Sequence, residues 1–72
     1  MRAKVNIDTF HKINDFVNIC SELDCKVMLT DGSGYCVSAK SLLGAIATTD
    51  WSQVFVECDR DIYTRIKSFI VE

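Results

Sequence analysis

Residues 35–47 read Tyr-Cys-Val-Ser-Ala-Lys-Ser-Leu-Leu-Gly-Ala-Ile-Ala, and the predicted fold depends on the change of pattern inside this stretch. Its first residues, through Tyr35, Val37 and Ala39, alternate like a strand with one buried face. After Lys40 the pattern becomes a compact apolar run, and Ser41 stands where a helix favours its N-cap. The stretch therefore predicts a strand followed directly by a short helix over about residues 42–48.

The segments before this stretch predict a strand, a helix and a hairpin. Residues 2–7 alternate as a first strand, and the apolar residues of 10–23 recur at helical spacing after an N-cap at Asp8 or Thr9. Residues 25–29 alternate again and lead into Asp-Gly-Ser-Gly. Because glycine readily adopts positive φ, this turn predicts a tight reversal into the strand at 35–39.

The segments after it predict a turn, a fourth strand and a last helix. Residues 48–50 have turn chemistry, and residues 53–58 alternate as a strand. We expect Asp59 to cap a final helix, whose apolar residues follow the i, i+4, i+7, i+8 rule at Ile62, Ile66, Phe69 and Ile70. The order β-α-β-β-α-β-α predicts one α+β domain over residues 1–72, with a four-stranded antiparallel sheet and three helices on one face.

One face of this sheet is expected to stay uncovered. The period of two places on it Lys4, Lys26, Met28, Cys36, Phe55 and Glu57. The apolar members, Met28, Cys36 and Phe55, form a modest patch through which two copies of the chain could associate as a homodimer.

Composition and charge exclude several classes of function. The 72 residues carry a net charge of −2, and their basic residues are scattered, so we expect no nucleic-acid binding. The chain has no apolar stretch near the roughly 20 residues of a membrane helix and no signal-peptide core. These features predict a soluble, cytoplasmic protein without membrane insertion. No motif indicates a cofactor.

The four cysteines are Cys20, Cys25, Cys36 and Cys58. They form no Cys-x-x-Cys pair and the chain has a single histidine, so no metal site is predicted. We expect all four to be small apolar residues that are kept reduced. A redox pairing of Cys20 with Cys25 would require the end of the first helix to approach the following strand closely.

Residues 37–44, Val-Ser-Ala-Lys-Ser-Leu-Leu-Gly, resemble the regulatory-serine segment of HPr, the histidine-containing phosphocarrier of the bacterial sugar phosphotransferase system, which typically reads Val-Asn-Ala-Lys-Ser-Ile-Met-Gly. The resemblance extends to the element order. It implies an open-faced β-sandwich in which the first and fourth strands are neighbours. It also implies that Ser41 is the residue phosphorylated by an ATP-dependent serine kinase, and that Leu42, Leu43 and Ile46, with Lys40, are the surface that docks onto partner enzymes such as Enzyme I.

The chemistry of the HPr family resides in another motif, Gly-Leu-His-Ala-Arg-Pro-Ala, and here the sequence departs from the family. The chain has no proline, and an ungapped alignment puts Thr9 at the phosphorylated histidine. A different gap puts His11 there, but with Ile13 in place of the arginine that holds the phosphate. Lys12 offers a point charge rather than a bidentate fork, and Asp15 would repel a phosphate.

Three hypotheses follow from these observations. The first is a non-catalytic binding or regulatory relative of HPr, acting through the surface from Ser41 to Ile46. The second is a working phosphocarrier with a divergent phosphoacceptor, His11, which accepts phosphate from Enzyme I and passes it to sugar-specific components. The third is a ligand-sensing module of the ACT kind, which has the same β-α-β-β-α-β order and would dimerise on binding a small molecule.

Overall fold

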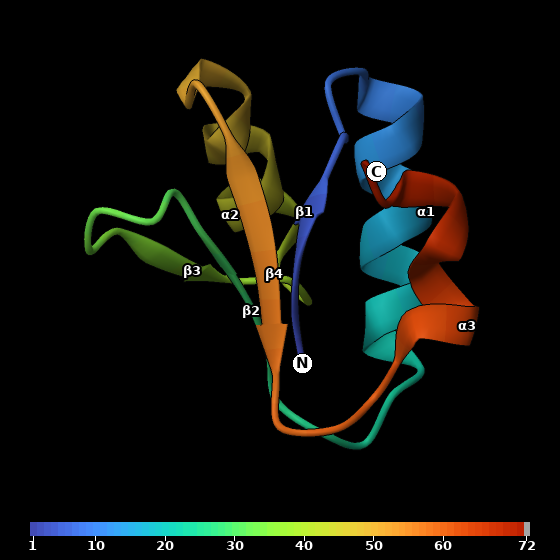
Figure 1. The fold of residues 1–72 in the computed structure, drawn as a ribbon. Coiled ribbons are helices and arrows are strands. Elements are labelled where there is room, and N and C mark those ends of the chain that lie inside the picture. Colours follow the sequence, from blue (N-terminus) through green and yellow to red (C-terminus); the bar gives the residue numbers. More distant parts are fainter. Residues whose placement is uncertain (72) are drawn as a thin grey trace.

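Four strands and three α-helices follow one another in the order β-α-β-β-α-β-α in the computed structural model, which describes residues 1–71 (Figure 1). This confirms the predicted α+β class and element order. The strands are β1 (Arg2–Val5), β2 (Val27–Thr30), β3 (Cys36–Ser38) and β4 (Val54–Cys58). The helices are α1 (Phe10–Ser21), α2 (Leu42–Ala47) and α3 (Tyr63–Ile66), and the short 3-10 turns η1 (Thr48–Asp50) and η2 (Lys67–Phe69) follow α2 and α3.

The sheet has the strand order β1-β4-β2-β3, and every neighbouring pair is antiparallel. The edge strand β1 therefore lies beside β4, as the resemblance to HPr implied. In the register, Val5 is opposite Val54 and Leu29 is opposite Val56. These residues are buried on the face that the helices cover, whereas Arg2 and Lys4 on the other face are exposed. One face of the sheet therefore remains open.

Local signals account for the first helix and the hairpin. Thr9 caps α1, because its hydroxyl accepts a hydrogen bond from the Lys12 amide at 3.2 Å. In the turn after β2, Gly32 and Gly34 have φ values of +86° and +119°. Residues with a Cβ adopt such values at a cost, which explains the two glycines.

The core lies between the inner face of the sheet and the helices. Ile13 and Phe16 of α1 are almost completely buried, and the Phe16 ring packs edge-on against Phe69 with 5.2 Å between ring centroids. Phe10 departs from the prediction, because its side chain is 64% exposed although it continues the apolar spacing of α1. Ile7, just before the helix, is buried and already occupies this end of the core.

The predicted cap of the last helix is wrong. The helix α3 begins at Tyr63, several residues after Asp59, and the Tyr63 amide donates a hydrogen bond to the Asp61 carboxylate at 3.0 Å. The chain between β4 and α3 instead bends at Asp59 and Arg60 and buries Ile62, which is 5% exposed. Burial of this apolar side chain and the alternative partner for the amide both favour the later start.

The end of the chain also departs from the predicted helix. Ile66 and Phe69 enter the core as expected, but Ile70 pairs with Val5 in an isolated antiparallel bridge. The Asn6 amide donates to the Phe69 carbonyl at 2.8 Å, and the Val71 amide donates to the Lys4 carbonyl at 2.9 Å. Because β1 is an edge strand, its outer backbone groups need partners, and the end of the chain supplies them.

The longest described helix, α1, has 12 residues. Within residues 1–71 no helix combines the length and the apolar character that a membrane span requires.

Candidate functional site

The short helix α2 begins where the sequence predicted. Ser41 has extended backbone angles, and its hydroxyl accepts a hydrogen bond from the Gly44 amide at 3.1 Å. Its carbonyl accepts from the Ala45 amide at 2.9 Å, and its own amide donates to the Ser38 carbonyl at 3.2 Å. The residue is exposed, so the hydroxyl both caps the helix and remains accessible from solvent.

The predicted docking residues of α2 differ in their exposure. Leu43 is 81% exposed and Leu42 is 38% exposed, whereas Ile46 is half-buried and packs against the core. The buried face of the helix is formed by Ala45. A short helix cannot bury three large residues that point in different directions, so two leucines are left in water.

A close approach to β3 fixes the position of α2. A Cβ atom placed on Gly44 would lie 3.3 Å from the Cβ of Val37 and 3.4 Å from the Ser38 carbonyl oxygen. These separations are tighter than ordinary van der Waals contact, so glycine allows the helix to approach the strand. The close packing turns Leu43 away from the sheet and toward solvent.

Lys40 has a structural partner. Its ammonium group donates a hydrogen bond to the Leu23 carbonyl at 2.6 Å, and the residue is half-buried. This carbonyl follows the end of α1, so the lysine joins the C-terminal end of α1 to the start of α2. Lys40 was predicted to bind a partner protein, but its ammonium group already binds the Leu23 carbonyl within the chain.

His11 lies in the first turn of α1, and its side chain is 88% exposed. Its Nε2 atom is 3.2 Å from a carboxylate oxygen of Asp15. The ammonium group of Lys12 is 3.4 Å from the Asp8 carboxylate, so the nearest lysine is paired with an acid. The groups around His11 are thus acidic or already paired, an environment that repels a phosphoryl group.

The residues beside the two predicted sites are connected to different ends of α1. Lys40, which precedes Ser41, contacts the C-terminal end of α1 through Leu23, whereas His11 is in the first turn of that helix. Twelve helical residues span about 18 Å. The contact made by Lys40, the residue before Ser41, is therefore about one helix length away from His11.

The open sheet face carries mixed chemistry rather than a continuous apolar patch. Met28 and Phe55 are half-buried, and Cys36 is exposed. The guanidinium carbon of Arg2 lies 4.7 Å from the centre of the Phe55 ring, and the same arginine is 3.5 Å from the Glu57 carboxylate. Since the Arg2 guanidinium lies over the aromatic ring, little apolar area is exposed there, and self-association through this face stays a prediction.

Three of the cysteines are buried and Cys36 is exposed. The sulfur of Cys25 contacts the sulfur of Cys58 at 3.4 Å, and the Cys58 sulfur is 3.9 Å from a carboxylate oxygen of Asp59. The hydrogen bond with Cys58, followed by burial, raises the pKa of the Cys25 thiol, and burial raises the pKa of Cys20 to about 12. The sulfur pair in contact is therefore Cys25 with Cys58, rather than Cys20 with Cys25, the pairing considered from the sequence.

These groups were also assessed as metal ligands. The ligand atoms of Cys25, Cys58 and Asp59 all lie within 4.8 Å of one another. A tetrahedral zinc ion with bonds of about 2.3 Å separates two sulfur ligands by about 3.8 Å, which is more than the contact found here. The three groups supply donors that suit a thiophilic ion, and only the two sulfurs are closer together than tetrahedral zinc would place them.

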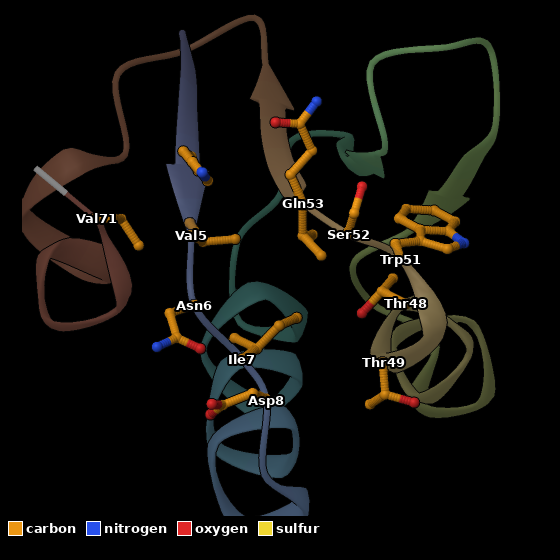
Figure 2. Close-up of a pocket in the computed structure, with 12 residues that line it drawn as sticks. Val5, Asn6, Ile7, Asp8, Thr48, Thr49, Trp51, Ser52, Gln53 and Val71 are labelled. Atoms are coloured by element: carbon orange, nitrogen blue, oxygen red, sulfur yellow. The ribbon is translucent and has the colours of Figure 1, made fainter.

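A pocket of about 280 Å³ lies where β1 and β4 diverge beyond the pair Val5 and Val54. Figure 2 shows β1 and the residues that follow it on one side, and the segment from Thr48 to Gln53 on the other. The walls combine apolar and polar side chains, among them Ile7, Val54, Trp51, Asn6, Asp8, Ser52 and Gln53. This volume is close to the lower limit of small-molecule sites.

Sequence reasoning missed both the pocket and the sulfur pair. The pocket is built from three segments that are far apart in the chain, and the pairing of Cys25 with Cys58 depends on the register between β2 and β4. Their only signals in the sequence were single residues, Trp51 after a turn and cysteines at the ends of predicted strands. No family model, curated protein or solved structure was found to match this chain.

Proposed function

We propose that this protein is a non-catalytic binding protein that docks a partner protein through the exposed start of α2. The observation that carries the proposal is the exposure of Leu43 beside Leu42, two large apolar side chains on one two-turn helix. Leucine in water forgoes the free energy of burial, and a partner that covers two adjacent leucines recovers it. Ile46 continues the apolar surface toward the core.

The class of partner is proposed from the resemblance of residues 37–44 to the regulatory segment of HPr. In this proposal the chain is a divergent relative of HPr that binds Enzyme I or another component of the sugar phosphotransferase system. Phosphorylation of Ser41 by an ATP-dependent serine kinase would regulate the docking. The exposed hydroxyl supports access for a kinase, and a phosphate beside Leu42 would add about −1.5 to −2 charge to an apolar contact.

Binding to purified Enzyme I tests the docking surface. We expect Leu43→Ala to weaken the affinity about tenfold or more, because it removes the most exposed apolar side chain of the surface. Tyr35→Ala is the matched control, since Tyr35 is 71% exposed but lies in the hairpin connection before β3. Equal affinities for the wild type and both variants would contradict the proposal, as would the absence of binding by the wild type.

Phosphorylation assays separate the regulatory role from the phosphocarrier alternative. With ATP and the serine kinase, we expect label on the wild type and none on Ser41→Ala. With phosphoenolpyruvate and Enzyme I, we expect no acid-labile phosphohistidine, because His11 lies beside Asp15 and, within residues 1–71, pairs with no arginine. Stoichiometric label that His11→Ala abolishes would overturn the non-catalytic reading and support a working phosphocarrier.

The pocket favours a second candidate, the ligand-sensing module. Its polar side chains and the indole of Trp51 suit a small polar molecule such as an amino acid. Sedimentation of the protein with each amino acid in turn tests this candidate, which requires ligand-dependent dimerisation. A monomer in every case would exclude it.

A further inference from the structure

The contact between Cys25 and Cys58 joins two parts of the chain that the fold holds in place. Cys58 ends β4, and its neighbour across the sheet is Val27. Cys25 lies two residues before Val27, in the connection between α1 and β2. The sulfur of Cys25 therefore lies diagonally across from that of Cys58, in contact at 3.4 Å.

A second interaction holds the same two segments together from the solvent side. The guanidinium group of Arg60 is 2.7 Å from the Asp24 carboxylate. Asp24 precedes Cys25 and Arg60 follows Cys58 by two residues, so the ion pair and the β2–β4 ladder flank the sulfurs. The backbone at the end of β4 is further fixed by the Cys58 amide, which donates to the Met1 carbonyl at 2.9 Å.

Cys25 and Cys58 are buried but keep a small accessible area. Cys25 and Cys58 are each 8% exposed, whereas Cys20 is fully buried. A disulfide bond is about 2.0 Å long, so the sulfurs must approach by only about 1.4 Å, a distance that side-chain rotation can supply.

We propose that Cys25 and Cys58 are a site of oxidative modification, at which a peroxide converts the two thiols into an intramolecular disulfide. One thiol, as its thiolate, attacks a peroxide oxygen, the O–O bond breaks, and water leaves after taking up a proton. The resulting sulfenic sulfur is attacked by the second sulfur, the S–O bond breaks, and a second water leaves. Two thiols and one hydrogen peroxide thus give one disulfide and two waters, a balanced two-electron oxidation.

The protonation of the two thiols determines how fast they are oxidised. The raised pKa of the Cys25 thiol keeps it mostly protonated at neutral pH, and the thiolate is the nucleophile. The reaction is therefore slow compared with that of a catalytic dithiol, and the disulfide acts as a covalent lock on the fold. The disulfide joins two residues that are 33 positions apart in the sequence, and so restricts the unfolded chain. We expect it to lower the unfolding equilibrium constant by a few hundredfold.

Peptide mapping of the full chain tests the proposal. Cys36→Ser, which removes the exposed thiol and prevents intermolecular cross-links, is treated with hydrogen peroxide and compared with an untreated sample. Trypsin alone leaves Cys20 and Cys25 in one peptide, and a protease that cuts after glutamate separates them at Glu22. We expect the peptide of residues 23–26 to be joined by a disulfide to the peptide of residues 58–60. The mass of the pair should be that of the two peptides less two hydrogen atoms, and dithiothreitol should separate them.

Two outcomes of the peptide mapping would contradict the proposal. Three free thiols after prolonged treatment, or a cross-link that includes Cys20, would overturn the proposal. A second measurement, urea unfolding of the oxidised and reduced samples, requires no substitution in the core. An unfolding midpoint that does not rise on oxidation would refute the role of the disulfide as a lock.

Discussion

Replacing Ser41 with alanine removes one hydrogen bond and leaves the backbone of the helix start intact. The lost interaction is the one that the Ser41 hydroxyl accepts from the Gly44 amide at 3.1 Å. The bonds from the Ser41 amide to Ser38 and from the Ala45 amide to the Ser41 carbonyl involve only main-chain atoms and remain. The substitution therefore isolates the capping role of the side chain.

The expected cost is about 1 kcal/mol, the usual value for replacing an N-cap serine with alanine. A domain of 72 residues has a free energy of unfolding of roughly 4–11 kcal/mol, so the change is a measurable fraction and lowers the folding equilibrium constant about fivefold. Ser41→Asp should remain close to the wild type, because aspartate caps as well as serine and its charge suits a helix N-terminus.

Urea unfolding followed by the fluorescence of Trp51 measures both variants. The midpoint for Ser41→Ala should fall with an unchanged slope, which indicates a loss of stability without a change in the surface exposed on unfolding. Two results would refute the reasoning. One is an alanine variant as stable as the wild type, and the other is an aspartate variant that loses as much stability as the alanine variant.

Three further predictions concern other contacts. Gly44→Val should lower the free energy of unfolding by about 1–3 kcal/mol, because the added side chain meets Val37, and Gly44→Ala should have a smaller effect. An unchanged melting temperature of the valine variant would contradict the close packing of α2 against β3. Lys40→Met should cost about 1–2 kcal/mol in urea unfolding, since the Leu23 carbonyl loses its charged donor. Hydrogen bonds from Ser33 lower the pKa of Asp31 below 3.8, so the Asp31 carboxylate stabilises the fold above pH 3.8 and this contribution is lost as the pH falls through the lowered pKa. In urea unfolding at a series of pH values, Asp31→Asn should therefore lose less stability than the wild type on the acid side.

Much of the fold could be predicted because its signals are local. The capping hydroxyls of Thr9 and Ser41 bond with amides three residues away, and the glycines of the hairpin act within a single turn. Period-two alternation likewise identified which residues of β1 and β4 face the core. In each case the residues that decide the conformation are neighbours in the chain.

The last helix shows where such signals fail. The spacing of Ile62, Ile66, Phe69 and Ile70 suits a helix and correctly indicated burial, yet Ile70 pairs with Val5 instead. The competing interaction comes from the free edge of β1, which lies at the other end of the sequence. No window of local sequence contains that competitor.

At the candidate site, too, some features follow from the local sequence and others from tertiary contacts. The sequence by itself determined that a serine-capped helix with surplus leucines follows a strand at Ser41, because capping and periodicity act over a few residues. Only the tertiary structure decided that Leu43 rather than Ile46 faces water, that the Lys40 charge is engaged by Leu23, and that Cys25 meets Cys58. These outcomes depend on strand register and on the close packing of α2 against β3, which arise between segments far apart in the chain.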